Sequence, residues 1–197
     1  LGGKRFLAAL EAAHAAYAAG HPDRAERLAT EAESLTGDRS VLADAVFLRA
    51  QVRYERVSPE ADAVLALQAA ALVPDDDPGS AALILIEATC AAKDASDPGL
   101  LWQAVEHLRR LRLPDGSDEA LANAAMIAWA DILDGRPERA AAPIGKLVRA
   151  ARERPLDDLH RVVAGFSGLL LADDDAVVEV MSAMVDDARA HGKLTWI

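Results

Sequence analysis

The sequence is poor in cysteine and in aromatic residues, and each shortage excludes a class of protein. Its single cysteine, Cys90, cannot form a disulfide within the chain. A disulfide-stapled extracellular scaffold is therefore excluded, and a reducing, cytoplasmic location is expected. Aromatic residues make up only 4% of the chain, although 52% of it is hydrophobic. Alanine supplies much of this apolar fraction, which favours closely packed helices over β-strands.

Two further absences concern membranes and nucleic acids. No run of about 18 or more apolar residues occurs, so we expect no membrane span. Basic residues are also outnumbered, because 21 lysines and arginines stand against 32 aspartates and glutamates, which gives a net charge of −11. A phosphate backbone is held by clustered lysine and arginine. We therefore expect no direct contact between this segment and nucleic acid.

A repeated turn is the main pattern that the sequence does contain. Its helix-opening proline recurs at spacings of 37, 39 and 39 residues, and an aspartate follows 37 residues later, at Pro22, Pro59, Pro98, Pro137 and Asp174. Proline fits the first turn of a helix, where its missing N–H would have no partner. Three of these starts follow a residue that can cap a helix, namely Ser58, Asp97 and Asp173. A turn repeated at a near-constant period predicts an array of helical hairpins.

Two other positions keep their character in each repeat. Nine residues before each helix start the residue is small, as in Ala13, Ala50, Thr89, Ala128 and Gly165. Ten residues after each start it is apolar, as in Ala32, Ala69, Leu108, Leu147 and Met184. Two helices approach closely only where one of them presents a small side chain, so the first position marks the crossing point of each pair.

The repeats predict an all-α fold of about five antiparallel helix hairpins, stacked as a single helical-repeat domain over residues 1–197. The five repeats are expected at roughly residues 4–37, 40–74, 79–113, 117–154 and 155–191. Within them we expect one helix from Pro98 to about Leu113 and another from about Pro155 to Leu171. A helix starting at Pro137 would contain Pro143, which should kink it or move its start downstream.

One face of the first helix in each repeat is expected to line the inner surface of this array. The position after each small residue, and the position three residues further on, should point toward it. The candidate binding-surface residues are accordingly His14, Tyr17, Gln51, Tyr54, Cys90, Lys93, Trp129 and Phe166. The alternative is that several of them merely pack against the next helix pair.

No motif in the sequence indicates catalysis, a cofactor or a metal. The five histidines are scattered without metal-ligand spacing, which favours surface or capping positions. Cys90 lies in the most apolar helix with no histidine near it in the sequence, so we expect a buried and unreactive thiol. Glu87, in the same helix, is expected to form a structural ion pair with an arginine such as Arg49 or Arg53. We therefore predict that this segment is not an enzyme and holds no cofactor.

The pattern resembles the tetratricopeptide repeat. The match is best in the first unit, where the small and turn residues of that motif correspond to Ala13, Gly20, Ala25 and Ala32. Other units depart from it, because larger residues replace the expected alanine at Asp62, Leu101 and Val177. The spacing of 37 to 39 residues also exceeds the usual period of about 34. The resemblance implies a right-handed α–α superhelix.

A more specific resemblance is carried by the longer period, the alanine richness and two phrases, A-L-I-L-I-E-A-T-C-A-A at residues 82–92 and M-V-D-D-A-R-A-H-G-K-L at residues 184–194. They are similar to the helical-repeat region of large LuxR-type (MalT-like) bacterial transcriptional regulators. In that family an ATP-binding module precedes the repeats and a helix-turn-helix DNA-binding domain follows them. The chain begins without methionine, and a new apolar pattern starts at its end, so we expect an internal segment of a longer protein.

Two functions follow as expectations. The resemblance implies a regulatory sensor that binds an effector or its own flanking domains, makes autoinhibitory contacts or self-associates. The alternative is a general scaffold whose inner surface binds a partner protein. An enzyme is the least expected of the three classes.

Overall fold

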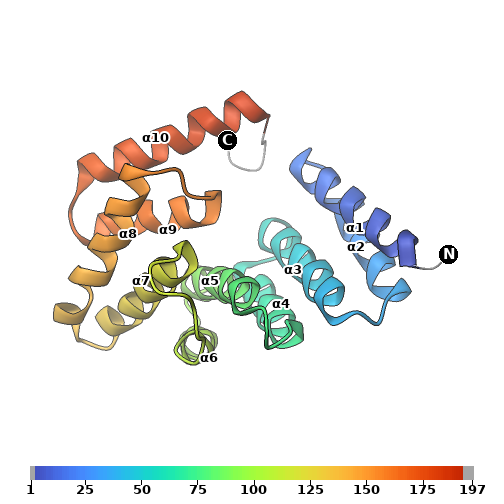
Figure 1. Cartoon of the computed structure of the whole chain (residues 1–197), viewed down its shortest axis with the longest axis horizontal. Helices are drawn as coiled ribbons and strands as arrows, with labels where there is room; N and C mark the ends of the chain where they lie inside the picture. The colour runs from blue at the N-terminus through green and yellow to red at the C-terminus, as the bar shows by residue number, and fades with distance from the viewer. Residues whose placement is uncertain (1–2, 193–197) are drawn as a thin grey trace. The chain divides into compact units, whose positions relative to one another are not determined.

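The structure, a computed structural model, describes residues 3–192 and is entirely helical over that range (Figure 1). It contains ten α-helices: α1 (Gly3–Ala18), α2 (Pro22–Leu35), α3 (Arg39–Arg56), α4 (Pro59–Leu72), α5 (Pro78–Asp94), α6 (Pro98–Leu108), α7 (Asp118–Leu133), α8 (Ala141–Glu153), α9 (Asp158–Leu170) and α10 (Asp174–His191). A short 3-10 helix, η1 (Pro137–Arg139), precedes α8. The all-α prediction is confirmed for these residues, whereas the right-handed superhelix and the single domain stay predictions.

Four α-helices start at the residues that the repeated turn predicts, Pro22, Pro59, Pro98 and Asp174, and three of these starts are capped as expected. Ser58 accepts a hydrogen bond from the N–H of Ala61 at 3.2 Å. Asp97 and Asp173 accept in the same way from Leu100 at 3.0 Å and Ala176 at 3.1 Å. The three predicted capping residues are therefore confirmed.

The two repeated positions are buried throughout. The small residues Ala13, Ala50, Thr89, Ala128 and Gly165 are all buried, and so are the apolar residues Ala32, Ala69, Leu108, Leu147 and Met184. At Gly165 a Cβ atom would collide with the side chain of Met181 on α10. The repeated position with a small residue therefore marks close approach of two helices, as predicted.

Three helix limits differ from the expected ones. α6 ends at Leu108 rather than near Leu113, because its last turn closes with Arg110 N–H bonding to the carbonyl of His107. α9 starts at Asp158 rather than near Pro155, because Asp157 caps it by accepting from the N–H of His160.

The third limit concerns the helix after Pro137. That proline opens only the short helix η1, and α8 starts downstream at Ala141. Pro143 then falls in the first turn of α8, where its missing N–H costs no hydrogen bond. This is one of the two outcomes that its position predicted.

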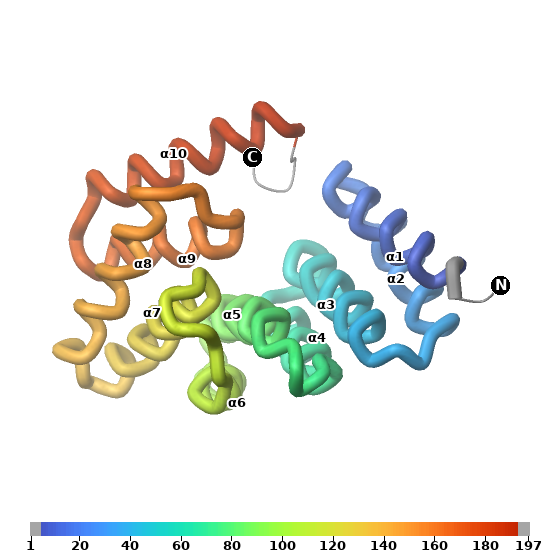
Figure 2. The backbone as a smooth tube through the Cα atoms, viewed as in Figure 1, coloured from blue at the N-terminus to red at the C-terminus, as the bar shows by residue number. Residues whose placement is uncertain are grey.

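The helices divide into two compact units. The first, described here over residues 3–104, contains α1 to α5 and the start of α6. Each of its helices from α1 to α5 packs on the next, and α1 also contacts α3. Figure 2 shows α1 and α2 side by side as an antiparallel pair. Its core is rich in alanine, with Ala13, Ala32 and Ala45 fully buried around Leu48.

The second unit, residues 105–192, contains the end of α6 and the helices α7 to α10. Here α7 packs on α8 and α9, while α10 packs on α9 and α8. The prediction that the histidines lie at the surface or cap helices is wrong for His160. This residue is buried, with its Nδ1 2.7 Å from the capping carboxylate of Asp157. None of the helices in residues 3–192 is both long and apolar enough to cross a membrane.

Candidate functional site

The two tyrosines of the chain connect the odd-numbered helices of the first unit. Tyr17 of α1 donates a hydrogen bond from its hydroxyl to Glu55 Oε1 of α3, at 3.0 Å. Tyr54 of α3 repeats the contact by donating to Asp94 Oδ2 of α5, at 2.8 Å. These bonds bring the side chains of α1, α3 and α5 into one row.

The other candidate residues of this unit lie along the same helices. His14 Nε2 lies 2.9 Å from Asp44 Oδ1 of α3, and this hydrogen bond raises the pKa of the imidazole. Lys93 Nζ forms an ion pair with Asp94 at 2.8 Å. Gln51 and Cys90 are both half-buried.

The two candidates from the second unit differ from each other in exposure. Trp129 is only 9% exposed, and its indole N–H donates to Ser167 Oγ at 2.9 Å. Phe166 is 45% exposed. Both residues belong to the second unit, whereas the row on α1, α3 and α5 belongs to the first. A binding role for any of the eight candidates stays a prediction.

The most unusual side chain of the first unit is Asp62, in the first turn of α4. It is 0% exposed, and neither of its carboxyl oxygens has a hydrogen-bond partner within the part of the chain that the structure describes. An ionised carboxylate in such a position is strongly disfavoured. Burial, and secondarily the nearby charge of Glu87, raise the pKa of Asp62 to about 8.

Glu87 of α5 lies at the centre of this group. Burial, and then the charge of Asp94, raise its pKa to about 7. Its own charge in turn raises the pKa values of groups on three other helices, Tyr17 of α1, Tyr54 of α3 and Asp62 of α4. Four helices therefore place titratable groups around one carboxyl group.

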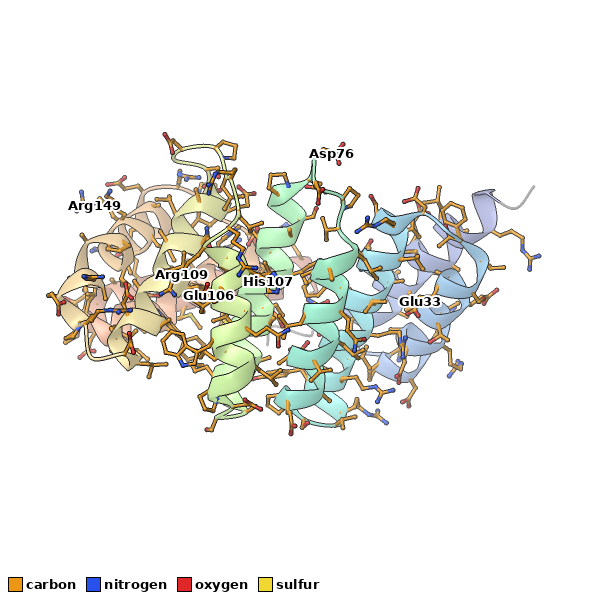
Figure 3. The ribbon with its side chains drawn as sticks, turned by 90° about the horizontal axis from the view of Figure 1, so that it is seen from below. Glu33, Asp76, Glu106, His107, Arg109 and Arg149 are labelled. Carbon is orange, nitrogen blue, oxygen red and sulfur yellow. The ribbon has the colours of Figure 1, made fainter. Side chains whose placement is uncertain are left out.

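The predicted ion pair between Glu87 and an arginine is wrong. Arg49 pairs with Glu33 of α2 at 2.9 Å, and Arg53 pairs with Glu26 of α2 at 2.8 Å. The two arginines lie one turn apart, on the side of α3 that faces α2. Figure 3 shows Glu33 on α2. Glu87 is thereby left without a basic partner from α3.

We call the group formed by these side chains the carboxyl cluster: Tyr17, Tyr54, Glu55, Asp62, Glu87 and Asp94. Burial and the hydrogen bond to Asp94 raise the pKa of Tyr54 to about 12, and burial with the charge of Glu55 raises that of Tyr17 further. Both phenols therefore remain hydrogen-bond donors at neutral pH. Burial, followed by the charge of Glu87, also raises the pKa of the adjacent Cys90 thiol, which keeps it protonated and weakly nucleophilic.

The cluster is suited to binding a positively charged group. It contains four carboxyl groups, and perturbed carboxyl pKa values of this kind are typical of functional sites. No three or more histidine, cysteine, aspartate or glutamate side chains in residues 3–192 are grouped so that they could hold a metal ion. Separate N–H donors of an organic cation therefore match these carboxyl groups better than a single inorganic ion does.

An apolar cavity of about 380 Å³ lies elsewhere in the same unit, between the N-terminal halves of α3 and α5. Phe47, Val73, Leu83 and Ile84 form its apolar walls, and Asp44 and Ser40 are among its polar lining residues. It is large enough to accept an apolar side chain.

Sequence reasoning identified the tyrosines but missed Glu55, Asp62 and Asp94 as parts of a site. The signal for Asp62 was present, because the repeat expects alanine at its position. The equivalent residues Ala25, Leu101 and Ala140 are all buried. Ala25 packs between Ala16 of α1 and Val52 of α3. The fifth equivalent residue, Val177, is partly buried, so Asp62 is the one charged residue at a largely buried position of the repeat.

Comparison with known protein families, with curated proteins and with solved structures finds no match for this chain. A functional inference must therefore start from the residues of the chain itself, and above all from Asp62 and Glu87.

Proposed function

We propose that this chain is a regulatory helical-repeat domain that binds an effector at the carboxyl cluster of its first unit and catalyses no reaction. One observation carries the proposal: Asp62 is buried with both carboxyl oxygens unpartnered within residues 3–192, and the charge of Glu87 beside it raises its pKa further. Leaving a buried carboxyl group without donors costs stability. A ligand that donates to Asp62 when it binds would offset this cost.

A wider role as the sensor region of a LuxR-type transcriptional regulator is part of the same proposal. It is supported by the sequence resemblance and is compatible with the helical architecture. In such a protein the partners of this domain would be the ATP-binding and helix-turn-helix modules on either side of it. Effector binding would act as a switch only if the ligand binds two conformations of the domain with different affinities. The cluster suits this requirement because its groups come from four separate helices.

The proposal is tested by thermal unfolding of the 197-residue chain in the presence of a panel of cationic, neutral and anionic metabolites. A ligand that binds only the folded state at 100 times its Kd should stabilise it by about 2.7 kcal/mol. The stabilisation by an active compound should be lost in Glu87→Gln and Tyr54→Ala and retained in Asp76→Asn. Asp76 is an exposed control residue in the loop between α4 and α5, as Figure 3 shows. A compound whose effect survives in both cluster variants binds elsewhere and contradicts the proposal.

A general scaffold for protein partners is the second candidate, and the apolar cavity between α3 and α5 favours it. A partner that inserts an apolar side chain there should lose affinity in Leu83→Asp but not in Glu87→Gln. Pull-down with the chain and these two variants separates the candidates, because an effector at the carboxyl cluster gives the opposite pattern.

A further inference from the structure

The chemical class of the effector follows from what the carboxyl cluster lacks. Its tyrosines donate to Glu55 and Asp94, which leaves those two carboxylates with a partner each. The two oxygens of Asp62 receive no such donor from residues 3–192, and Glu87 adds a second carboxyl group beside them. The site is therefore complete in acceptors and short of donors and positive charge.

We propose that the carboxyl cluster binds a primary ammonium group carried on an apolar stem, whose N–H groups donate to Asp62 and Glu87. This inference rests on the proposed effector-binding function and names its ligand class. An ammonium group is compact, carries three donors and has no acceptor, so it supplies what these carboxyl groups miss.

The surroundings of the site determine how binding depends on pH. Titratable or charged groups lie near Glu87 and Asp62 on three helices. They are Tyr17 on α1, Tyr54 and Glu55 on α3, and Cys90, Lys93 and Asp94 on α5, the helix of Glu87 itself. Lys93 is the one lysine or arginine among them, and it is paired with Asp94. The added cation therefore enters a region with an excess of acidic groups.

Proton release accompanies binding. The pKa of Asp62 is raised to about 8 and that of Glu87 to about 7, so at pH 7 both groups carry protons part of the time. A bound cation favours their ionised forms and lowers both pKa values. Binding at pH 7 should release more than about one proton, and affinity should rise at least about tenfold per pH unit between pH 6 and 7. Above about pH 8.5 the affinity should level off, because both groups are then already ionised.

The experiment is isothermal titration calorimetry of the 197-residue chain with 1,4-diaminobutane in two buffers of different ionisation enthalpy. Neither buffer should be a primary amine. We expect a saturable heat at one site, with a difference between the buffers that corresponds to proton release. In Asp62→Asn the affinity should fall at least about tenfold and the released protons should decrease. The isosteric asparagine removes a destabilising buried carboxyl group, so loss of binding cannot be attributed to unfolding.

Two controls separate this site from general attraction to an acidic surface. Asp76→Asn removes a carboxyl group at the exposed loop position and should leave the affinity unchanged. The fully N-methylated diamine has the same charge and length but no N–H donors, and it should bind at least about tenfold more weakly. Equal affinity of 1,4-diaminobutane for wild type and Asp62→Asn, or equal binding of the methylated diamine, would overturn the proposal, as would absence of binding.

The ammonium group can belong to a free amine or to a lysine side chain of a partner. Competition by Nα-acetyl-lysine methylamide that exceeds competition by 1-butylamine assigns it to a peptide lysine, and the reverse order assigns it to a free amine. Both results support the ammonium site. If the diamine fails but an anionic or neutral compound stabilises the chain through Glu87 and Tyr54, this inference is wrong while the proposed effector function stands.

Discussion

The indole N–H of Trp129 donates a hydrogen bond of 2.9 Å to Ser167 Oγ, which joins α7 to α9 across 38 residues. In the first unit Tyr17 donates to Glu55 across the same separation, from α1 to α3. The two bonds use different donors, at positions of the repeat that lie three residues apart. In both units polar bonds therefore link the first helices of consecutive repeats, in addition to the apolar contacts.

The bond in the second unit should have a measurable energy. Ser167 is fully buried, so Ser167→Ala leaves the indole N–H of Trp129 without this acceptor. We expect the free energy of unfolding to fall by about 1–2 kcal/mol. Trp129→Phe removes the donor and also leaves a cavity, so its loss should be larger, about 2–4 kcal/mol. Urea denaturation followed by circular dichroism measures both, and a Ser167→Ala variant as stable as wild type would show that the bond adds nothing.

Replacing each of two glycines of the second unit by alanine should change the stability of the chain in opposite directions. At Gly168 of α9 a Cβ atom would lie 2.8 Å from Val177 Cγ2 of α10. Because β-branched valine has little freedom to move, Gly168→Ala should destabilise the chain by about 1–3 kcal/mol. At Gly145 of α8 the nearest atom to a new Cβ is 3.9 Å away. There the higher helix propensity of alanine should stabilise by about 0.5–1 kcal/mol.

Thermal unfolding of the two variants gives this comparison directly. Both substitutions add one methyl group to a helix in the same unit, so helix propensity alone would raise stability in both. A rise for Gly168→Ala as well would mean that α9 and α10 do not pack as closely as the structure has them.

The helices were predictable because the signals for them are local. Proline in the first turn, a capping side chain before it and a small residue at the crossing point act within a few residues of each other. These signals place α2 at its observed limits, Pro22–Leu35. They fail at the end of α6, where residues after Leu108 keep an apolar pattern although the helix has closed. Such an ending depends on the following turn, which periodicity does not describe.

The partners of charged residues were less predictable, because they depend on which side of a helix faces which neighbour. Glu87 lies on α5 and Arg53 on α3, but Arg53 is directed to Glu26 of α2. The carboxyl cluster forms from four helices, and no local pattern records that Asp62 and Glu87 meet. The sequence contained only the replacement of an expected alanine by Asp62.

The two tyrosines provide a spectroscopic test of the cluster. They are the only tyrosines of the chain, so tyrosinate absorbance near 295 nm reports on this site alone. Tyr54 should titrate with a pKa of about 12 and Tyr17 still higher, against an ordinary value of about 10. In Tyr17→Phe a single transition near pH 12 should remain.

Circular dichroism recorded alongside establishes that the chain stays folded over the titrated range. Addition of urea should return both tyrosines to the ordinary value. A transition near pH 10 in the folded chain would contradict the hydrogen bonds to Glu55 and Asp94.

Replacing Asp62 by alanine, the residue at the equivalent positions 25 and 140, should stabilise the chain in a pH-dependent way. The pKa of Asp62 is about 8 in the folded chain and about 4 when unfolded, so between these values the unfolded state binds fewer protons. The contribution of Asp62 to the free energy of unfolding therefore becomes more unfavourable from about pH 4 to about pH 8 and is constant above it. Asp62→Ala should be similar to wild type near pH 4 and more stable by about 5 kcal/mol near pH 8. Urea denaturation at pH 4.5, 6 and 8 measures the difference, with Asp76→Ala as the exposed control that should show none. A gain that does not grow with pH would mean that Asp62 is paired in solution.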